Sequence, residues 1–312
     1  MKLARRSPAL KSARDVMAML LADKRSPNTR RAYRADLGDF FDGEPTPEVV
    51  RRFLSQDAGS MAYTLNAYKA DLLDRRLSEA TVNRRLSAVK ALINYARRVG
   101  ACEVDPRGLV DSEKVRQYRD TTGVGVAEMR RLLDLPDTST VKGKRDAAIL
   151  RLLWENGLRR AELCALDVPD FWLTEGKLYI RGKGRGTQKE PVTLSEKATS
   201  AIHEYLQATG RPSDTDGPLF LNCDRRGGGD RLTSEGLYKI VADYGKRAGI
   251  ARRLSPHRIR HSAITAALDA TAGNVRSVQR FSRHARIETL MMYDDNRRNF
   301  QAEVTELLSD LA

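Results

Sequence analysis

The strongest constraint on the fold of this chain is an interruption of its helical pattern between Cys102 and Gly125. Before this segment, apolar residues recur at the spacing of amphipathic helices and glycine is sparse. Within it, proline, glycine and charged residues break that periodicity, and regular patterns resume afterwards. The 312 residues suffice for about two domains. We therefore predict a domain over residues 1–101, a linker over 102–125 and a second domain over 126–312.

The first predicted domain has the pattern of helices throughout. Asn28 is the predicted N-cap of one helix, and Pro47 opens another because proline fits the first helical position. Ser78 or Thr81 caps the last helix, which carries apolar residues at alternating spacings of four and three. These residues are Val82, Leu86, Val89, Ile93 and Ala96. We expect this stripe to form the centre of a helical core.

The second predicted domain combines helices with a small sheet. Helices are expected over Val126–Leu135, Lys144–Asn156, 195–208, 234–248, 256–270, 274–282 and 286–293. Two short strands are expected over Leu178–Arg181 and Pro191–Leu194, around a turn rich in glycine and lysine. An amphipathic tail helix carries Val304, Leu307, Leu308 and Leu311, and it either packs on its own domain or docks on another molecule. The expected fold class is mainly α, with an α+β second domain.

The charge balance indicates a polyanionic partner. Lys and Arg number 55 against 41 Asp and Glu, which gives a formal net charge of +14. Such a surplus bears on partners and not on fold, and nucleic acid is the commonest polyanion. Basic residues on the polar faces of the N-terminal helices include Arg30, Arg31, Arg34, Arg84, Arg85 and Lys90. They form either a DNA-backbone surface or a merely solvated basic face.

Several classes of protein are excluded by composition. No apolar run reaches the ~18 residues of a membrane helix, and the short run Val16–Ala22 is followed by charges and not by a signal-peptide cleavage site. The three cysteines, Cys102, Cys164 and Cys223, have neither disulfide-framework nor metal-site spacing, which fits a reducing cytosol. No GxxxxGK[ST] loop is present, so we expect no nucleotide as partner. From the cysteine spacing and the short apolar runs we expect neither a metal nor a membrane.

Three separated segments carry candidate chemistry. In Gly157–Leu163, Glu162 follows Arg159 by three residues and lies on the same helix face, as a site contact or as a surface ion pair. In Ser255–Ser262, serine and proline start a helix that places His257 and Arg260 on one face, with His261 beside them. A phosphate contact alone would also explain that second segment. The third segment contains His284, and Tyr293 follows nine residues later.

Together these segments resemble the tyrosine recombinase (phage integrase) family. The family order of Arg–Glu, Lys, His-x-x-Arg, His and Tyr is matched by GLRRAEL, GKG, HRIRHS, SRH and MMY. The stretches SPNTRRAYRADLGDFF and SEATVNRRLSAVKALINYARRVG are similar to the family's core-binding domain. The resemblance implies a helical SAM-like core-binding domain joined to a catalytic domain of the DNA breaking-rejoining fold. Two departures stand out: Ala161 replaces a frequent serine, and Ser282-Arg283 replaces a usual Leu-Gly.

The resemblance implies a role for each matching residue. Arg159 and Arg260 would grip one DNA phosphate, because a guanidinium presents paired donors and stays charged. Tyr293 would attack phosphorus, Lys183 would protonate the leaving oxygen, His257 would assist proton transfer and His284 would hydrogen-bond the phosphate. Glu162 and His261 would order this cluster. Arg181, Arg185 and Lys189 would contact DNA from the same hairpin as Lys183, whose alternative is a solvated DNA-facing position.

The implied protein is a site-specific DNA recombinase of Xer or transposon type, a mobile-element or replicon-resolving enzyme. It would cleave and rejoin strands through a 3′-phosphotyrosyl intermediate without metal or ATP. Its partners would be double-stranded DNA and further copies of itself, forming a tetramer on two sites through the tail helix. It would act in the cytoplasm on the nucleoid. The alternatives are DNA relaxation of the type IB topoisomerase kind, or a non-catalytic DNA-binding or architectural protein.

Overall fold

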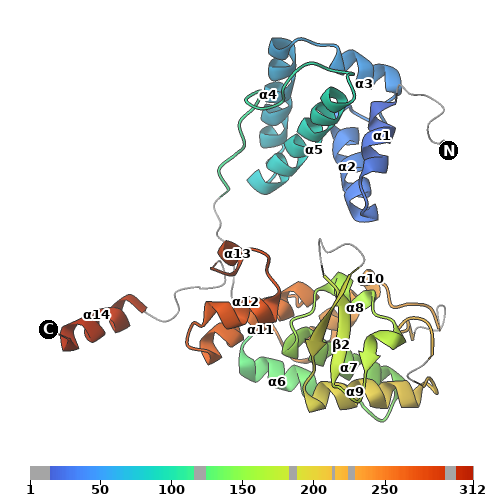
Figure 1. Cartoon of the computed structure of the whole chain (residues 1–312), viewed down its shortest axis with the longest axis vertical. Helices are drawn as coiled ribbons and strands as arrows, with labels where there is room; N and C mark the ends of the chain where they lie inside the picture. Colours follow the sequence, from blue (N-terminus) through green and yellow to red (C-terminus); the bar gives the residue numbers. More distant parts are fainter. Residues whose placement is uncertain are drawn as a thin grey trace, which may run out of the picture. The chain divides into compact units, whose positions relative to one another are not determined.

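The computed structural model describes residues 15–115, 124–182, 188–212, 215–223, 229–291 and 300–311. The chain divides into two compact units, Met1–Gln117 and Tyr118–Ala312, each with its own hydrophobic core. Both units are mainly helical, and a small sheet lies in the second, as predicted (Figure 1). Within the described residues, every helix is too short or too polar to cross a membrane.

Over residues 15–115, the N-terminal unit has five helices. These are α1 (Val16–Asp23), α2 (Pro27–Phe40), α3 (Pro47–Leu54), α4 (Ala58–Asp74) and α5 (Glu79–Arg98). Helix α3 begins at Pro47 as predicted, with Thr46 as its N-cap, and of the two candidates Ser78 caps α5. The N-cap of α2 is Ser26 and not Asn28. The reason is Pro27: its fixed φ starts the helix there, so the residue before it becomes the cap.

The core of this unit forms around α5. All five residues of its predicted apolar stripe are at most 1% exposed. The helix packs against α1, α2 and α4, and aromatic residues of α2 and α3 close one side, with the rings of Phe40 and Phe53 5.0 Å apart. The four–three spacing therefore places one face of α5 in the core, as the sequence indicated.

The first part of the predicted linker belongs to the N-terminal unit. Cys102, Leu109 and Val110 are buried in its core. Side chains of the helices hold the backbone of this segment: Asn66 donates to Leu109 O at 3.1 Å and Lys90 Nζ donates to Val110 O at 2.7 Å. Such side-chain-to-backbone bonds need no repeating pattern, so the segment has the composition of a linker although it is packed.

The second unit holds a three-stranded antiparallel sheet among helices. The helices are α6 (Val126–Asp134), α7 (Val141–Glu155), α8 (Arg160–Cys164), α9 (Glu196–Ala208), α10 (Ser234–Arg247), α11 (Pro256–Ala270), α12 (Val275–Ser282), α13 (Ile287–Met291) and α14 (Phe300–Asp310), with a 3-10 turn η2 at Val168–Asp170. The strands β1 (Phe171–Trp172), β2 (Lys177–Arg181) and β3 (Lys189–Thr193) lie in that order, and Leu178 pairs with both Phe171 and Val192. The sequence did not predict β1, because two residues are too few to show alternation.

Helix α7 lies at the centre of the second unit, packed between α9 and α11 (Figure 1). Residues on several of its sides are buried, including Ile149, Leu150, Leu152 and Leu153 at 0% exposure. A smaller cluster of Ile264, Leu268, Val278 and Leu290 joins α11, α12 and α13. These two clusters fix the ends of α7, α11 and α12, which carry the candidate site.

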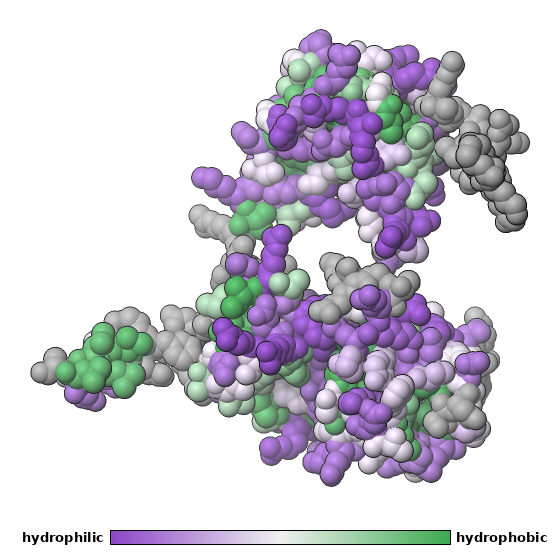
Figure 2. Space-filling model, in the orientation of Figure 1, coloured by the Kyte–Doolittle hydropathy of each residue, from purple (hydrophilic) through white to green (hydrophobic). Residues whose placement is uncertain are grey.

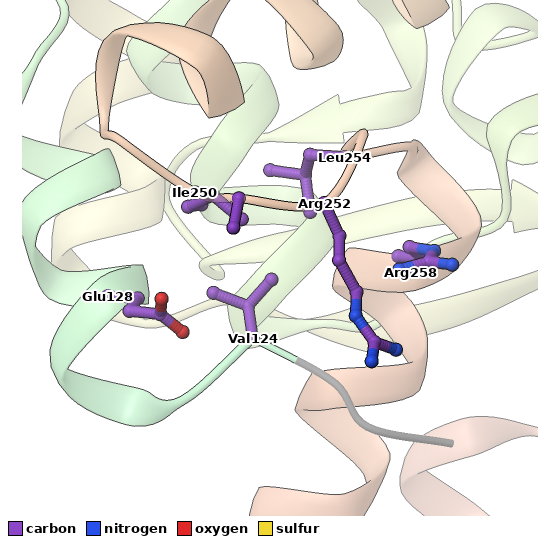
Figure 3. A pocket seen from close by; sticks show the side chains of 7 residues that line it. Val124, Glu128, Ile250, Arg252, Leu254 and Arg258 are labelled. Carbon is purple, nitrogen blue, oxygen red and sulfur yellow. The ribbon is translucent and has the colours of Figure 1, made fainter. Parts of the chain in front are cut away.

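The entry of the chain into the second unit is anchored to α11. The backbone N–H of Val124 donates to Ser262 Oγ at 2.7 Å. Val124, Ile250 and Leu254 line a groove of about 200 Å³, beside which Arg252 and Arg258 place their guanidinium groups (Figure 3). The start of this unit is therefore tied to the helix that bears His257 and Arg260.

Candidate active site

Arg159 lies at the start of α8, where it donates two hydrogen bonds to Glu162. The Glu162 carboxylate accepts the backbone N–H of Arg159 at 2.9 Å and one of its guanidinium nitrogens at 2.6 Å. The first bond satisfies a backbone donor that a helix start leaves open. Glu162 is only 4% exposed, whereas a quarter of the Arg159 side chain remains accessible. The carboxylate thus lies behind the arginine, which excludes the alternative of a surface ion pair.

The charge of Glu162 is maintained by its arginine neighbours. Burial by itself would raise the pKa of Glu162. The charge of Arg283 and the hydrogen bonds from Arg159 outweigh burial and hold the pKa below its usual value. The carboxylate is therefore ionised at neutral pH and orients Arg159 through charged hydrogen bonds.

Arg260 comes from α11, whose start is set by Ser255 and Pro256. Ser255 Oγ accepts the N–H of Arg258 at 3.2 Å, and proline occupies the first turn, as the sequence predicted. The guanidinium of Arg260 is 2% exposed and donates to the carbonyl oxygens of Gly157 and Ser282. Arg260 thereby joins the end of α7 to the end of α12.

Gly157 is required where α7 ends. Its φ is +53°, a left-handed conformation that side chains with a Cβ disfavour. A Cβ here would lie 3.3 Å from the ring of Phe281. Its carbonyl oxygen accepts hydrogen bonds from both Arg260 and Arg283. Glycine therefore lets the backbone turn and present this oxygen to two arginines.

The neighbours of His284 determine which of its two ring nitrogens carries the proton. Arg260 has only donors, and its Nη2 lies 3.4 Å from His284 Nε2, so Nε2 accepts. Nδ1 then carries the proton and donates to Ser282 Oγ at 3.0 Å, while the serine hydroxyl donates to Gln279 O at 3.3 Å. Burial and then the charges of Arg260 and Arg159 lower the pKa of His284 to about 4. The imidazole is therefore neutral at pH 7.

Four of the expected site residues line one cavity of about 620 Å³: Arg159, Arg260, His257 and His284. Tyr238 of α10 also lines it. His257 is exposed in the first turn of α11, whereas His261 lies one turn further on and is 9% exposed. The cavity thus gathers positive and imidazole groups from α8, α11 and the segment after α12, as a phosphate site requires.

Arg159 and His284 also line a neighbouring cavity of about 360 Å³. Gly182, which follows β2 and precedes Lys183 in the sequence, lines this cavity too. Lys183, Arg185 and Tyr293 themselves lie outside the described residues. The described chain resumes at Gln188, and Glu190 of β3 lines the same cavity.

The basic residues predicted to contact DNA differ in their surroundings. Arg34 is exposed on α2, and Arg30 and Arg31 are exposed there while bonding to Lys24 O and Asn28 Oδ1 respectively. Arg84 pairs with the buried Asp36 but keeps half its side chain accessible. In the second unit, Arg181 is exposed at the end of β2, opposite Lys189 of β3, which pairs with Asp170. These residues retain accessible surface for a phosphate.

Two of the predicted DNA contacts are bound within the N-terminal unit. Arg85 is 17% exposed in its side chain and pairs with Asp39 at 2.5 Å. Asp39 also accepts from Arg75 at 2.8 Å and from Tyr68 at 2.8 Å. Lys90 binds the backbone of Val110, as described above. Arg85 thus joins α5 to α2 and Lys90 joins α5 to the segment after it, roles that a helical spacing alone does not reveal.

Sequence reasoning assigned no role to Ser282 or Arg283, although both contact the site. Ser282 accepts from His284, and Arg283 donates to Glu162 at 3.1 Å and to three backbone carbonyls. Their signal in the sequence was the departure from the Leu-Gly of the family pattern. Only the structure shows where the two replacing side chains point.

Comparison with known proteins identifies the class. The pattern of the "Phage integrase family" matches residues 125–299, and that of the "Phage integrase, N-terminal SAM-like domain" matches residues 17–100. A tyrosine recombinase of Synechocystis sp. is 47% identical over 301 residues, covering 95% of each chain. Tyrosine recombinase XerC of Herpetosiphon aurantiacus is 33% identical over 268 residues, covering 85% of this chain and 84% of the other.

A solved structure shows the same fold. The Tn1549 transposon integrase, in complex with transposon right end DNA, superposes with a TM-score of 0.65 over 96% of this chain and 100% of the other, at 19% identity. With both family patterns and close relatives in agreement, the chain belongs to the phage integrase family, the tyrosine recombinases. It is accordingly an enzyme of DNA strand exchange.

Proposed function

We propose that this enzyme performs site-specific recombination by holding one scissile phosphate between Arg159, Arg260, His257 and His284. The observation that carries the proposal is the single cavity that all four side chains line. In the attack on a phosphodiester, negative charge grows on the non-bridging oxygens. Donors already in place at those oxygens stabilise this charge, and removing one typically costs about 10²–10³-fold in rate.

Tyr293 is the proposed nucleophile. Its oxygen attacks phosphorus, the bond from phosphorus to the 5′ oxygen breaks, and a 3′-phosphotyrosyl bond forms. His257 takes the tyrosine proton and Lys183 supplies the proton that the departing 5′ oxygen needs. Attack by a 5′-hydroxyl reverses the step with a second strand. Because one phosphoester replaces another at each step, the exchange needs no ATP.

The location of the flanking residues supports both assignments. Gly182, next to Lys183 in the chain, lines a cavity together with Arg159 and His284. Helix α13 ends two residues before Tyr293 and is fixed by Leu290, which is 0% exposed against α11 and α12. Both segments thus leave the described fold close to elements that carry the phosphate-binding groups.

The duplex is proposed to lie against basic residues of both units, including Arg34, Arg84 and Arg181. Six to ten phosphate contacts would make the affinity fall about 10³–10⁵-fold between 50 and 200 mM salt. Such contacts hold DNA without reading its sequence, so the target site must be found by experiment. The site of action that follows from this partner is the nucleoid in the cytoplasm.

Assembly into a tetramer on two sites is proposed to use the tail helix α14. Val304, Leu307 and Leu308 of α14, with Leu311 directly after it, are between 53% and 82% exposed and form an apolar surface (Figure 2). Burying this surface in a neighbouring copy would stabilise the assembly by removing apolar area from water. The variant Leu307→Asp with Leu308→Asp is expected to bind DNA as smaller complexes in native mass spectrometry. Undiminished tetramers would contradict this use of α14.

Trapping on nicked DNA tests the proposed function. Wild-type protein is incubated with a pool of nicked duplexes of randomised sequence, in which the short cleaved fragment diffuses away and leaves the protein attached. We expect recovered adducts to share one sequence, which excludes a non-catalytic DNA-binding protein. On a supercoiled plasmid, relaxation that needs no particular sequence would instead favour the topoisomerase alternative.

A further inference from the structure

The residue before His284 has an unusual backbone conformation for its type. Arg283 ends α12 with φ 57° and ψ 39°, in the left-handed region. Only glycine adopts this region without steric cost, and the family pattern usually has glycine here. A cost retained at a site residue suggests that the side chain contributes something a glycine cannot.

The Arg283 side chain is largely buried, and both terminal nitrogens of its guanidinium donate hydrogen bonds. It is 10% exposed. Its Nη1 donates to Asn156 O at 3.1 Å and to Phe281 O at 3.0 Å. Its Nη2 donates to Gly157 O at 3.2 Å and to Glu162 Oε2 at 3.1 Å. The side chain therefore connects the end of α7, the start of α8 and the end of α12.

These contacts close a ring around Arg159. Glu162 Oε1 accepts from the guanidinium of Arg159, and Glu162 Oε2 accepts from both the backbone of Arg159 and the side chain of Arg283. Arg159 Nη2 in turn donates to the backbone oxygen of Arg283 at 3.1 Å. Arg159 is thus held through the side chain of Glu162 and the backbone of Arg283, and Arg283 links the two.

The same side chain also meets the partner of the second arginine. Gly157 O accepts from Arg283 and from Arg260, so both guanidinium groups share one carbonyl oxygen. Glu162 is 4% exposed, and its charge compensates that of the buried Arg283. A buried carboxylate that lost one of two cationic partners would shift toward the other and move it.

We propose that Arg283 is a positioning residue, which fixes Arg159 through Glu162 and fixes the backbone that carries His284. The proposal rests on the proposed function, because it concerns how the phosphate-binding groups are held. Arg283 itself acts through Arg159 and His284 and not as a reacting group. Where glycine would leave the backbone free to move, the guanidinium of Arg283 holds it through hydrogen bonds to three neighbouring segments.

Cleavage of pre-bound DNA by Arg283→Gly tests the proposal. The probe is the nicked duplex recovered by trapping with wild-type protein, at saturating protein concentration. Glycine suits the left-handed backbone, so any loss of activity reports the missing side chain. We expect single-turnover cleavage to slow about 10²-fold, as for a small misplacement of binding groups, with DNA affinity within about three-fold of wild type. Arg283→Lys, which keeps the charge but not the planar donors, should recover only part of the rate.

Arg76→Gly is the matched control. Arg76 is also an arginine in the left-handed region after a helix, with φ 54°, but its side chain is exposed and it lies in the N-terminal unit. It should cleave bound DNA at the wild-type rate. In the double variant of Arg283→Gly with Glu162→Gln, cleavage should slow by less than the product of the two single losses, because both residues act on Arg159 through a shared path.

Three results would overturn the proposal. The first is cleavage by Arg283→Gly within three-fold of wild type. The second is multiplication of the two losses in the double variant, and the third is full recovery by lysine, which would show that charge alone matters. Thermal unfolding of each variant shows whether the protein tested is folded. If Arg283→Gly does not fold, the cleavage rates of Arg283→Lys and Glu162→Gln test the proposal. Wild-type protein that formed no adduct would overturn the proposed function instead.

Discussion

The carboxylate of Glu162 binds Arg159 through both its side chain and its backbone, at 2.6 Å and 2.9 Å. One residue thereby fixes the start of α8 and the direction of a phosphate-binding guanidinium. The carboxylate is 4% exposed, so water does not compete for these bonds. The position of the charge in the site is consequently a property of the fold and not of a flexible surface side chain.

Glu162→Gln should lower the free energy of unfolding by about 3 kcal/mol, because two buried arginine contacts lose their counter-charge. Chemical denaturation at pH 7 measures this loss. Glu204→Gln is the control: Glu204 of α9 pairs with Lys144 at 3.2 Å, but its side chain is 51% exposed. Such a pair contributes at most about 1 kcal/mol. Equal losses in the two variants would show that burial of Glu162 adds nothing.

Ser282→Ala should slow cleavage of bound DNA about five-fold, the size of one lost hydrogen bond. The serine hydroxyl is the acceptor that keeps the proton of His284 on Nδ1. Without it the imidazole can rotate or change tautomer, while affinity for DNA should stay unchanged. Ser277→Ala, at an exposed position on the same helix α12, serves as control in the same single-turnover assay. A cleavage rate unaffected by Ser282→Ala would contradict the assigned tautomer.

DNA binding should take up a proton between pH 4 and pH 6.5, because the pKa of His284 is about 4 in the free protein and a bound phosphate would raise it. The groups that bear on His284 are Arg159, Arg260, Arg283 and His257, with Glu190 and Arg280 on the adjoining cavity. Calorimetry at pH 5.5 in buffers of different ionisation enthalpy measures the uptake.

His284→Gln should remove this uptake. The sign for stability follows from the same shift. Since the pKa of His284 is lower in the folded state, the unfolded state binds more protons below pH 6.5, and acidification toward pH 4 destabilises the free protein. DNA binding that released protons in this range would contradict the assignment of His284 as a phosphate contact.

Gly157→Ala should reduce both stability and cleavage. A Cβ at φ +53° is strained by about 1 kcal/mol and would press on the ring of Phe281, displacing the oxygen that Arg260 and Arg283 share. Gly210→Ala is a matched control, since Gly210 has φ +64° in the same unit with open space around its Cβ position. It should lose similar stability and no cleavage activity. Equal activity in the two variants would show that the shared carbonyl is unimportant.

Periodicity predicted the helical core of this protein well, because residues such as Leu86 and Ile93 repeat on one face of α5. It predicted less where short-range chemistry decides the structure. Because Pro27 begins α2, the N-cap of this helix is Ser26 and not the predicted Asn28. Side chains such as Asn66 hold a packed segment that has the composition of a linker. Strand β1 was missed because it spans two residues and is defined by its pairing with β2.

The candidate site was predictable where a residue type fits only one chemistry. Arg159, Arg260, His257 and His284 were identified from the resemblance, and the fold brings them to one cavity. Arg283 was not, because its contacts join segments more than 120 residues apart in sequence. Arg85 and Lys90 show the opposite limit: on a helix they share the spacing of exposed basic residues, yet they bind within their own unit.

Peptide mapping of the trapped covalent adduct tests the central assignment most directly. The adduct formed on nicked DNA is digested with nuclease and protease, and tandem mass spectrometry locates the nucleotide remnant. We predict the remnant on Tyr293 through a 3′-phosphate, and we predict that Tyr293→Phe binds the same DNA without forming an adduct. A remnant on another residue, such as Tyr238 in the same cavity, or an adduct that persists in Tyr293→Phe, would contradict the account.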